Sequence, residues 1–258
     1  MRCLALLNKI FNYKYKNKHI VITLLGFIRF KIKTKNIKAF NNTILLHYQD
    51  GRIKEVDINK IQGLKISMSG SNNTIKIYEP YCFKNCKLYI NGNNNIFEVF
   101  ATKKSINNTV FNMQIRGENR RISIGKNCYI GEALLINNNN NSEILIDDDC
   151  MLSANIHIRT DDGHIICQAG TKNIINYGGD VSIGKHTWIS RGVFINKNVS
   201  IPQNTIIGAG AIITKSFSQS NTIIAGIPAK IVKRDVDWYY NQREMDEKFY
   251  ENNQEFKK

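Results

Sequence analysis

The chain has 258 residues and a formal net charge of +15, so it is long enough to bury a substantial core in one or two domains. The charge is uneven, because residues 1–49 hold ten basic side chains and no Asp or Glu. The other 209 residues carry 26 basic and 21 acidic side chains, a net charge of +5. This distribution argues against a nucleic-acid-binding protein with one broad basic face.

A basic segment, residues 1–60, is the first predicted unit and should contain a short helix and one or two strands. Its longest apolar run, 20–28, has nine residues, whereas a membrane span needs about 20. The sequence shows neither a signal peptide nor metal-finger spacing of its six cysteines, which predicts a cytoplasmic protein with reduced thiols. We expect residues 1–40 to contact an anionic polymer or the surface of the inner membrane.

Irregular coils of a β-solenoid are predicted for residues 61–121. The stretches GSNNTIKI (70–77), GNNNIFEV (92–99) and INNTVFNM (106–113) each join a Gly/Asn turn to an alternating strand. Isoleucine, with 41 residues, favours extended structure, and asparagine, with 34, tolerates the left-handed backbone of tight turns. We therefore expect short strands joined by asparagine-rich corners.

A six-residue repeat dominates residues 122–234. Its longest uninterrupted run consists of Ile183, Ile189, Ile195, Ile201, Ile207 and Ile213. Six residues rotate an α-helix by about 600°, so a helix keeps no single face at this spacing. The repeat instead predicts an all-β solenoid in which each flat side points one aliphatic side chain into a shared core. Three hexads would close one triangular coil.

A loop at residues 159–180 interrupts the repeat and contains RTDDGHIICQAGTKNIINYGG (159–179). Two aspartates, Asp161 and Asp162, precede its histidine, His164. Long irregular insertions in a compact domain are usually functional or disordered. We therefore select His164 as a candidate functional residue.

The last segment, residues 235–258, is charged and aromatic and contains no Gly or Pro. This composition predicts a C-terminal helix. We expect the helix to cover the open end of the solenoid, where a bare sheet edge would invite aggregation.

Four stretches in this order resemble the hexapeptide-repeat acyltransferases: TDDGHII (160–166), VSIGKHTWISRGVFI (181–195), IIGAGAIITKSF (206–217) and IIAGIPAKIVKRDVDW (223–238). Within that family the chain is most similar to the O-acetyltransferases of bacterial capsule, sialic-acid-polymer and lipopolysaccharide clusters. The resemblance implies a left-handed β-helix over residues 122–234, a homotrimer with active sites between neighbouring solenoids, and acetyl-CoA as the acyl donor. It also implies that His164 is the general base and that Trp188 lines the same cleft.

The chemistry of acyl transfer fits these positions. A histidine, with an ordinary pKa of about 6.5, can accept the proton of a sugar hydroxyl near neutral pH. Asp162, or else Asp161, is a candidate to orient the histidine ring, and a backbone carbonyl would serve as well. The backbone N–H groups of residues 190–192 are candidates to stabilise the tetrahedral oxyanion.

The expected donor site combines small residues with cations. Small side chains keep the coil surface low, so that an extended pantetheine arm can lie along the backbone. Positive side chains would hold the phosphates of CoA. The candidates are Gly192, Gly208, Ala209, Gly210, Ala211, Lys215 and Lys230, with Arg234 as a further cation.

The predicted acceptor is a hydroxyl of a surface glycan, either a capsular polysaccharide or a lipopolysaccharide sugar, because of the extra asparagine-rich coils and the basic leader. Three alternatives stay open. One is an acetyltransferase acting on a small acceptor such as serine, a sugar nucleotide or an antibiotic, and another is a non-enzymatic glycan-binding scaffold. The third is a γ-type zinc carbonic anhydrase using His157, His164 and His186, although their spacing differs from that family's and we predict no metal site.

Overall fold

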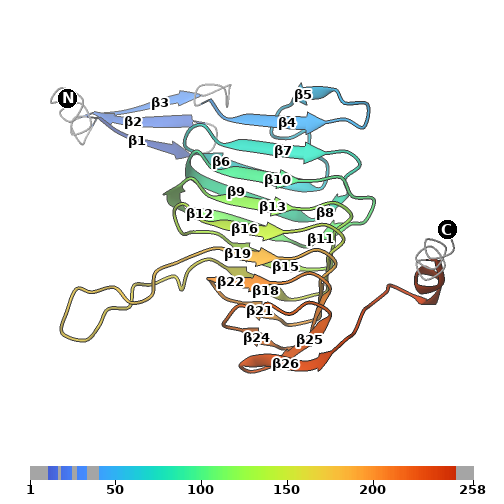
Figure 1. Ribbon diagram of the computed structural model, residues 1–258. Coiled ribbons are helices and arrows are strands. Elements are labelled where there is room, and N and C mark those ends of the chain that lie inside the picture. The colour runs from blue at the N-terminus through green and yellow to red at the C-terminus, as the bar shows by residue number, and fades with distance from the viewer. Residues whose placement is uncertain (1–10, 17–18, 25–27, 34–40, 248–258) are drawn as a thin grey trace.

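The predicted solenoid is present in the computed structural model, which describes residues 11–16, 19–24, 28–33 and 41–247. Between residues 43 and 234 the chain winds through three sheets of mainly parallel strands (Figure 1). The prediction of an all-β, left-handed parallel β-helix is confirmed. Within the described part of the chain, no helix has the length and apolar character needed to cross a lipid bilayer.

The three sheets form three flat faces, numbered here in the order in which each coil visits them. The first face contains β4 (Thr43–His47), β7 (Thr74–Tyr78), β10 (Ile96–Val99), β13 (Arg121–Ile124), β16 (Glu143–Ile146), β19 (Val181–Ile183) and β22 (Val199–Ile201), with the antiparallel β5 (Ile53–Glu55) at its end. The second face contains β8 (Phe83–Lys84), β11 (Ile106–Asn107), β14 (Tyr129–Ile130), β17 (Met151–Leu152), β20 (Trp188–Ile189), β23 (Thr205–Ile207) and β25 (Thr222–Gly226), followed by the antiparallel β26 (Ala229–Arg234). The third face contains β6 (Leu64–Ser69), β9 (Cys86–Asn93), β12 (Val110–Glu118), β15 (Ala133–Ile136), β18 (Ile156–Arg159), β21 (Phe194–Ile195) and β24 (Ile212–Ile213).

The isoleucines of the six-residue repeat form the core. Ile183, Ile189 and Ile195 belong to β19, β20 and β21, one on each face, and all three are buried. Three successive hexads therefore close one coil, as predicted. Strands of neighbouring coils lie about 4.8 Å apart, so these side chains stack into one continuous apolar core along the solenoid axis.

Asparagines occupy the corners between faces. Asn72, Asn94, Asn119 and Asn141 have φ angles between 53° and 57°. They stack on successive coils, and Asn119 Nδ2 donates to Asn141 Oδ1 at 2.8 Å. Asparagine tolerates this left-handed backbone better than most residues, because its short amide can bond locally. The prediction of asparagine-rich corners is confirmed.

The β-helix begins before residue 61. β4 pairs in parallel with β7, so the irregular coils expected for residues 61–121 extend back to residue 43. Side chains alternate between the two sides of β4, and Ile44 and Leu46 point into the core, so this strand already belongs to the solenoid. Upstream, β1 (Phe11–Lys16), β2 (His19–Leu24) and β3 (Ile28–Lys33) form a separate antiparallel sheet. The described residues of 1–60 contain strands and no helix, so the short helix expected in this segment is not among them. The side chains of residues 1–40 lie outside the described residues.

The C-terminal segment differs from the helix expected over residues 235–258. Residues 235–240, called the strap below, are not helical and run back along the side of the solenoid (Figure 1). Helical structure in the described part of this segment is confined to residues 242–247. Within residues 235–247, Trp238 is buried against the coil that contains His186 and not at the open end of the solenoid.

Candidate functional site

The loop that interrupts the repeat is an extended arm. It leaves the edge between the third and first faces, called the arm edge below, after β18 and returns at β19 (Figure 1). Its two legs are joined by a bridge between Cys167 and Ile174. Four apolar side chains of the arm are exposed in the single chain: Ile165, Ile166, Ile175 and Tyr177. Exposed apolar surface of this kind is typical of a segment that contacts another chain.

Polar contacts hold the base of the arm next to His164. Lys197 Nζ contacts the Asp162 carboxylate and also donates to Asn176 O at 2.9 Å. Asn176 Nδ2 donates to Asp162 Oδ2 at 2.9 Å and to the backbone O of His164 at 2.8 Å. Asp162 therefore positions the backbone of His164 through Asn176. Orientation of the His164 ring by Asp162 stays a prediction.

The two aspartates before His164 have different environments. Asp161 Oδ1 accepts a hydrogen bond from Gly163 N at 2.6 Å and lies 3.7 Å from Arg159 Nη2, so this residue shapes the local turn. Asp162 has a pKa below its ordinary value, because its carboxylate accepts hydrogen bonds from Lys197 and Asn176. Asp162 is therefore the aspartate that anchors the arm to the solenoid.

Replacing Lys197 with methionine is expected to loosen the arm without unfolding the solenoid. The contact between Lys197 and the Asp162 carboxylate lowers the pKa of Asp162, so it stabilises the arm fully at pH values above the ordinary pKa of 3.8. This stabilisation is lost as the pH falls through the lowered pKa. Protection of residues 162–178 against hydrogen exchange, taken relative to the intrinsic rate at each pH, should therefore fall in the wild type below about pH 4, and should already be low at pH 7 in Lys197→Met. Lys185→Met, which removes an exposed pair with Asp149, is the control. Equal exchange in the two variants at pH 7 would contradict the anchoring role.

Trp188 lies on the second face, in the outward row of β20. Alternation along this strand buries Ile189 in the core and turns Trp188 outward. Its neighbours in register are Met151 and Ile206. The Trp188 ring is partly buried, and the ring of Trp238 in the strap lies 6.0 Å from it, centroid to centroid. The strap is therefore one wall of the surroundings of Trp188.

His186 attaches the strap to the coil that carries Trp188. The rings of His186 and Trp238 stack with their centroids 4.4 Å apart. Trp238 Nε1 donates to His186 O at 2.9 Å, and His186 Nε2 lies 3.1 Å from Asp237 Oδ1. His186 is therefore a docking residue for the strap.

Replacing Trp238 with alanine is expected to weaken strap docking by about 3 kcal/mol, because large-to-small changes at buried aromatic positions cost this much. Limited proteolysis should then cleave within residues 235–247 faster than in the wild type. Trp188, the other of the two tryptophans, should become more accessible to an acrylamide quencher. Trp238→Phe keeps most of the ring packing and should show a smaller change. Unchanged cleavage in Trp238→Ala would mean that other contacts hold the strap.

Most candidate donor residues lie on the edge between the second and third faces, called the glycine edge below. They are Gly192, between β20 and β21, and Gly208, Ala209, Gly210 and Ala211, between β23 and β24. Gly192 and Gly210 have φ angles of 73° and 69°, and a Cβ added at either would meet no atom closer than 3.9 Å. Backbone conformation therefore explains these two glycines. Their missing side chains leave a low surface in front of the backbone.

The backbone N–H groups of residues 190–192 are mostly used within the coils. Ser190 N donates to Ile207 O at 2.9 Å, and Gly192 N donates to Ala154 O at 3.0 Å. Within the described part of the chain, the N–H of Arg191 has no backbone acceptor. Arg191 is therefore the residue of this tripeptide whose N–H can serve a bound molecule.

The candidate cations do not gather at the glycine edge. Lys215 follows β24 at the arm edge and is exposed, and Lys230 is exposed on β26. Arg234 Nε donates to Gln219 Oε1 at 3.0 Å. Lys215 therefore shares an edge with His164, apart from the small residues proposed to bind the same donor.

In one chain, the candidate residues fall into two separate groups. His164 and Asp162 lie at the arm edge, whereas Trp188 and Gly192 lie on the second face and the glycine edge. Both edges border the third face. From β12 to β24 one outward row of the third face is apolar apart from a histidine, and it runs through Val110, Leu134, His157, Phe194 and Ile212. On β9 and β6 the same row continues with Lys87 and Lys65. The candidate residues therefore do not make a complete site within a single chain.

Sequence reasoning did not identify Lys197, Asn176 or Trp238. Lys197 is 35 residues from Asp162, and the closing of one coil brings the two together. Trp238 ends the stretch IIAGIPAKIVKRDVDW (223–238), which resembles the hexapeptide-repeat acyltransferases, but residues 235–258 were expected to be helical. No local pattern marks any of these contacts, because each joins segments that are distant in the sequence.

The three histidines of the zinc alternative lie on different parts of the solenoid. His157 stacks on Phe194 on the third face, with ring centroids 4.5 Å apart. His164 is on the arm, and His186 is bound to the strap. Among the described residues, no group of three or more His, Cys, Asp or Glu is suited to hold a metal ion. A shared ion would need residues from more than one chain.

Comparison with known proteins points to one class of enzyme. No protein-family model matches the chain. A polysialic acid O-acetyltransferase of Neisseria meningitidis is 36% identical over 195 residues, which span 67% of this chain and 88% of that protein. A polysialic acid O-acetyltransferase of Escherichia coli O1:K1 is 43% identical over 90 residues, which span 35% of this chain and 29% of that protein.

Solved structures show the same similarity. The polysialic acid O-acetyltransferase OatWY matches with a TM-score of 0.63 and 26% identity, covering 82% of this chain and 98% of OatWY. The polySia-specific acetyltransferase NeuO matches with a TM-score of 0.53 and 27% identity, covering 71% of this chain and 92% of NeuO. The similarity therefore extends over most of the β-helix and is not confined to one motif.

Proposed function

Because the chain belongs to the family of the bacterial polysialic acid O-acetyltransferases, it is an O-acetyltransferase, and we propose that it transfers an acetyl group from acetyl-CoA to a hydroxyl of a capsular polysaccharide. The relatives are named for a polymeric acceptor, which supports a polysaccharide over serine, a sugar nucleotide or an antibiotic. Family membership also favours an enzyme over a binding scaffold and over a carbonic anhydrase.

One observation carries the location of the site: the two groups of candidate residues lie on the two edges that border the third face. In a threefold assembly that brings third faces together, the arm edge of one chain can meet the glycine edge of the next. His164 of one chain then faces Trp188 of its neighbour. The exposed apolar side chains of the arm and the third face support this arrangement, because a trimer would bury them.

The residues at this junction have separate roles in the proposed reaction. His164 takes the proton of the acceptor hydroxyl while the hydroxyl oxygen bonds to the carbonyl carbon of the acetyl thioester. The N–H of Arg191 donates to the oxyanion that develops on the carbonyl oxygen. When the C–S bond breaks, the proton held by His164 passes to the departing sulfur. The products are the acetylated sugar and CoA, and His164 returns to its neutral form.

The donor is proposed to lie along the glycine edge. The low surface at Gly192 and Gly210 leaves room for an extended pantetheine arm beside the backbone. Lys230 and Lys215 are proposed to hold CoA phosphates, with Lys215 contributed by the neighbouring chain because it lies at the arm edge. We place the reaction in the cytoplasm, since acetyl-CoA is made there and the five described cysteines are free thiols.

Mixing two inactive chains tests the shared site. His164→Ala and Trp188→Ala proteins are each expected to lose acetyl transfer. When the two variants are co-expressed in equal amounts, each junction between chains has an intact arm in about half of cases and an intact second face in about half. About a quarter of the junctions then have both, so the mixed trimers should regain about a quarter of the wild-type rate. The rate is measured as CoA thiol released in the presence of capsular polysaccharide, and sedimentation checks the trimer.

Two outcomes would contradict parts of this proposal separately. If mixed trimers form but recover no activity, the site is not shared between chains. If the wild-type trimer releases no CoA thiol with any polysaccharide, the proposed acceptor class is wrong. Sedimentation then still decides whether the trimer forms.

A further inference from the structure

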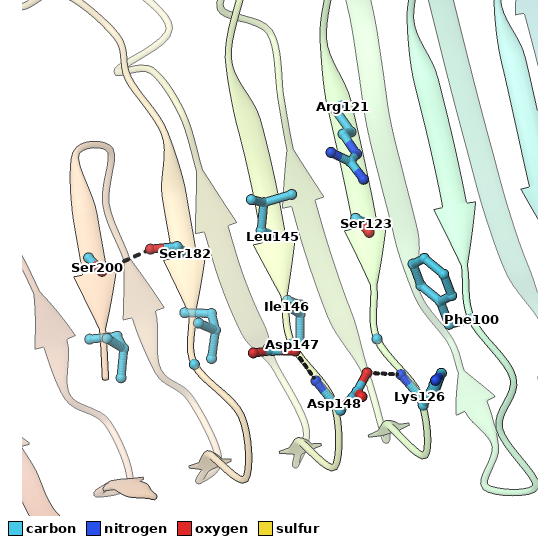
Figure 2. A pocket seen from close by; sticks show the side chains of 14 residues that line it. Phe100, Arg121, Ser123, Lys126, Leu145, Ile146, Asp147, Asp148, Ser182 and Ser200 are labelled. Carbon is cyan, nitrogen blue, oxygen red and sulfur yellow. Dashed lines mark hydrogen bonds between the residues drawn. The ribbon is translucent and has the colours of Figure 1, made fainter. Parts of the chain in front are cut away.

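A groove crosses the first face, the face that takes no part in the proposed trimer contact. Its volume is about 520 Å³ (Figure 2). It extends across five strands of this face, from the end of β10 to β22. With strands about 4.8 Å apart, the groove is about 19 Å long. That length suits an extended chain molecule better than one small ligand.

The floor of the groove is a row of four outward side chains, three serines and one leucine. Ser123, Leu145, Ser182 and Ser200 follow one another in register across four neighbouring strands. Ser182 Oγ donates to Ser200 Oγ at 2.9 Å (Figure 2), so the Ser200 hydroxyl keeps its own proton to donate. Small hydroxyl side chains make the floor low and polar.

An aromatic ring stands at one end of the groove. Phe100 follows β10, and its ring stacks on Tyr78 of the preceding coil with centroids 4.8 Å apart. The backbone N–H of Phe100 donates to the O of Ile124 on the next coil. The residue after Ile124, Gly125, is therefore the neighbour of Phe100 in this row. A glycine there leaves the second face of the Phe100 ring without a covering side chain from that row. This face is available to the C–H groups of a ligand.

The charges around the groove cancel. Its lining has two cations, Arg121 and Lys126, and two anions, Asp147 and Asp148. Arg121 is already paired with the buried carboxylate of Glu98. A groove without net positive charge does not favour nucleic acid, an anionic lipid surface or a polyanionic glycan. The exposed carboxylate of Asp147 can instead accept hydrogen bonds from hydroxyl groups.

We propose that this groove binds uncharged sugar units of the acceptor glycan that are remote from the unit that is acetylated. The C–H face of one sugar stacks on Phe100, and sugar hydroxyls bond to Asp147 and Ser200. The groove runs across the strands, and Phe100 and Asp147 follow the carboxyl ends of β10 and β16, so these contacts lie on the side of the first face opposite the arm edge. The inference rests on the proposed function and deepens it, because an acceptor with uncharged sugars differs from a homopolymer of sialic acid.

Saturation-transfer NMR on the full-length protein tests the groove directly. The probes are cellotetraose, which is uncharged, and a tetramer of sialic acid, which is anionic. We expect cellotetraose to bind the wild type, and to bind about tenfold more weakly after Phe100→Ala or after Ser182→Phe, which fills the floor. Ser67→Phe makes the same change at an exposed position of the third face and should leave binding unchanged.

The kinetic counterpart separates this inference from the proposed function. Ser182→Phe should raise KM for the polysaccharide about tenfold while KM for acetyl-CoA stays the same. If no polysaccharide is acetylated, the proposed function fails, and the NMR result still decides the groove. The groove proposal is overturned if cellotetraose gives no signal, if both groove variants bind it as the wild type does, or if only the sialic acid tetramer competes for these residues.

Discussion

Replacing His164 with alanine is expected to lower the rate of acetyl transfer by about 10²–10⁴-fold, the contribution usual for a positioned general base. The loss should appear in kcat, because His164 is assigned to proton transfer and not to donor binding. The fold should be unaffected, since the side chain is exposed on the arm and lies outside the core. Release of CoA thiol at saturating acetyl-CoA measures the rate, and the thermal midpoint checks the fold.

Lys172→Ala is the matched control for this prediction. Lys172 is exposed near the tip of the same arm, eight positions after His164, and has no proposed role. It should keep the wild-type rate. If Lys172→Ala is as slow as His164→Ala, the arm matters as a docking element and the histidine is not the base. If His164→Ala keeps more than about a tenth of the rate, another group takes the proton.

Replacing Arg120 with methionine is expected to lower the free energy of unfolding by about 3–5 kcal/mol, because several oxygens lose their donor and each buried unpaired group costs about 1–3 kcal/mol. Arg120 is 1% exposed, and its guanidinium donates to Ile115 O and to Asn91 O, both at 2.7 Å. Its Nε donates to Asn95 Oδ1 at 2.9 Å. Methionine fills a similar volume but would leave the buried Asn95 Oδ1 and the two partly buried backbone oxygens without this donor.

The position of Arg120 explains why an arginine is buried here. Asn42, Asn73 and Asn95 form a ladder inside the first three coils, in which each amide bonds to the next coil. Arg120 continues this ladder in the fourth coil and spans a wider corner. Burial lowers the pKa of Arg120 to about 10, so it stays charged at neutral pH and its burial has a cost that the hydrogen bonds offset.

Chemical denaturation at pH 7 measures the change. Arg116→Met is the control, because Arg116 is exposed in the same turn of the chain, and its change should stay within about 0.5 kcal/mol. A loss below about 1 kcal/mol in Arg120→Met would mean that water replaces the guanidinium and satisfies the oxygens.

The regular half of the β-helix was predictable because its signal is local. Each hexad places one aliphatic residue on one face, so the spacing of Ile183, Ile189 and Ile195 is enough to predict which side chains form the core. The arm was predictable for the same reason, since an insertion of about twenty residues stands out against a strict period. The irregular coils before Ile124 were less well placed, because their longer corners conceal the period and their start was put at residue 61 instead of 43.

The sequence by itself determined the parallel β-helix and the position of the arm, because periodicity is a property of neighbouring residues. The candidate pair His164 and Trp188 came from the resemblance to the hexapeptide-repeat acyltransferases. Only the tertiary structure decided that these two side chains lie at different parts of the solenoid in one chain. It also decided that Lys197 anchors the arm and that the strap packs on His186. These contacts join residues of different coils, and their partners are set by how far each coil advances and where each corner turns. The spacing of residues along the chain does not show which side chains of different coils meet, because these contacts form only when the coils stack.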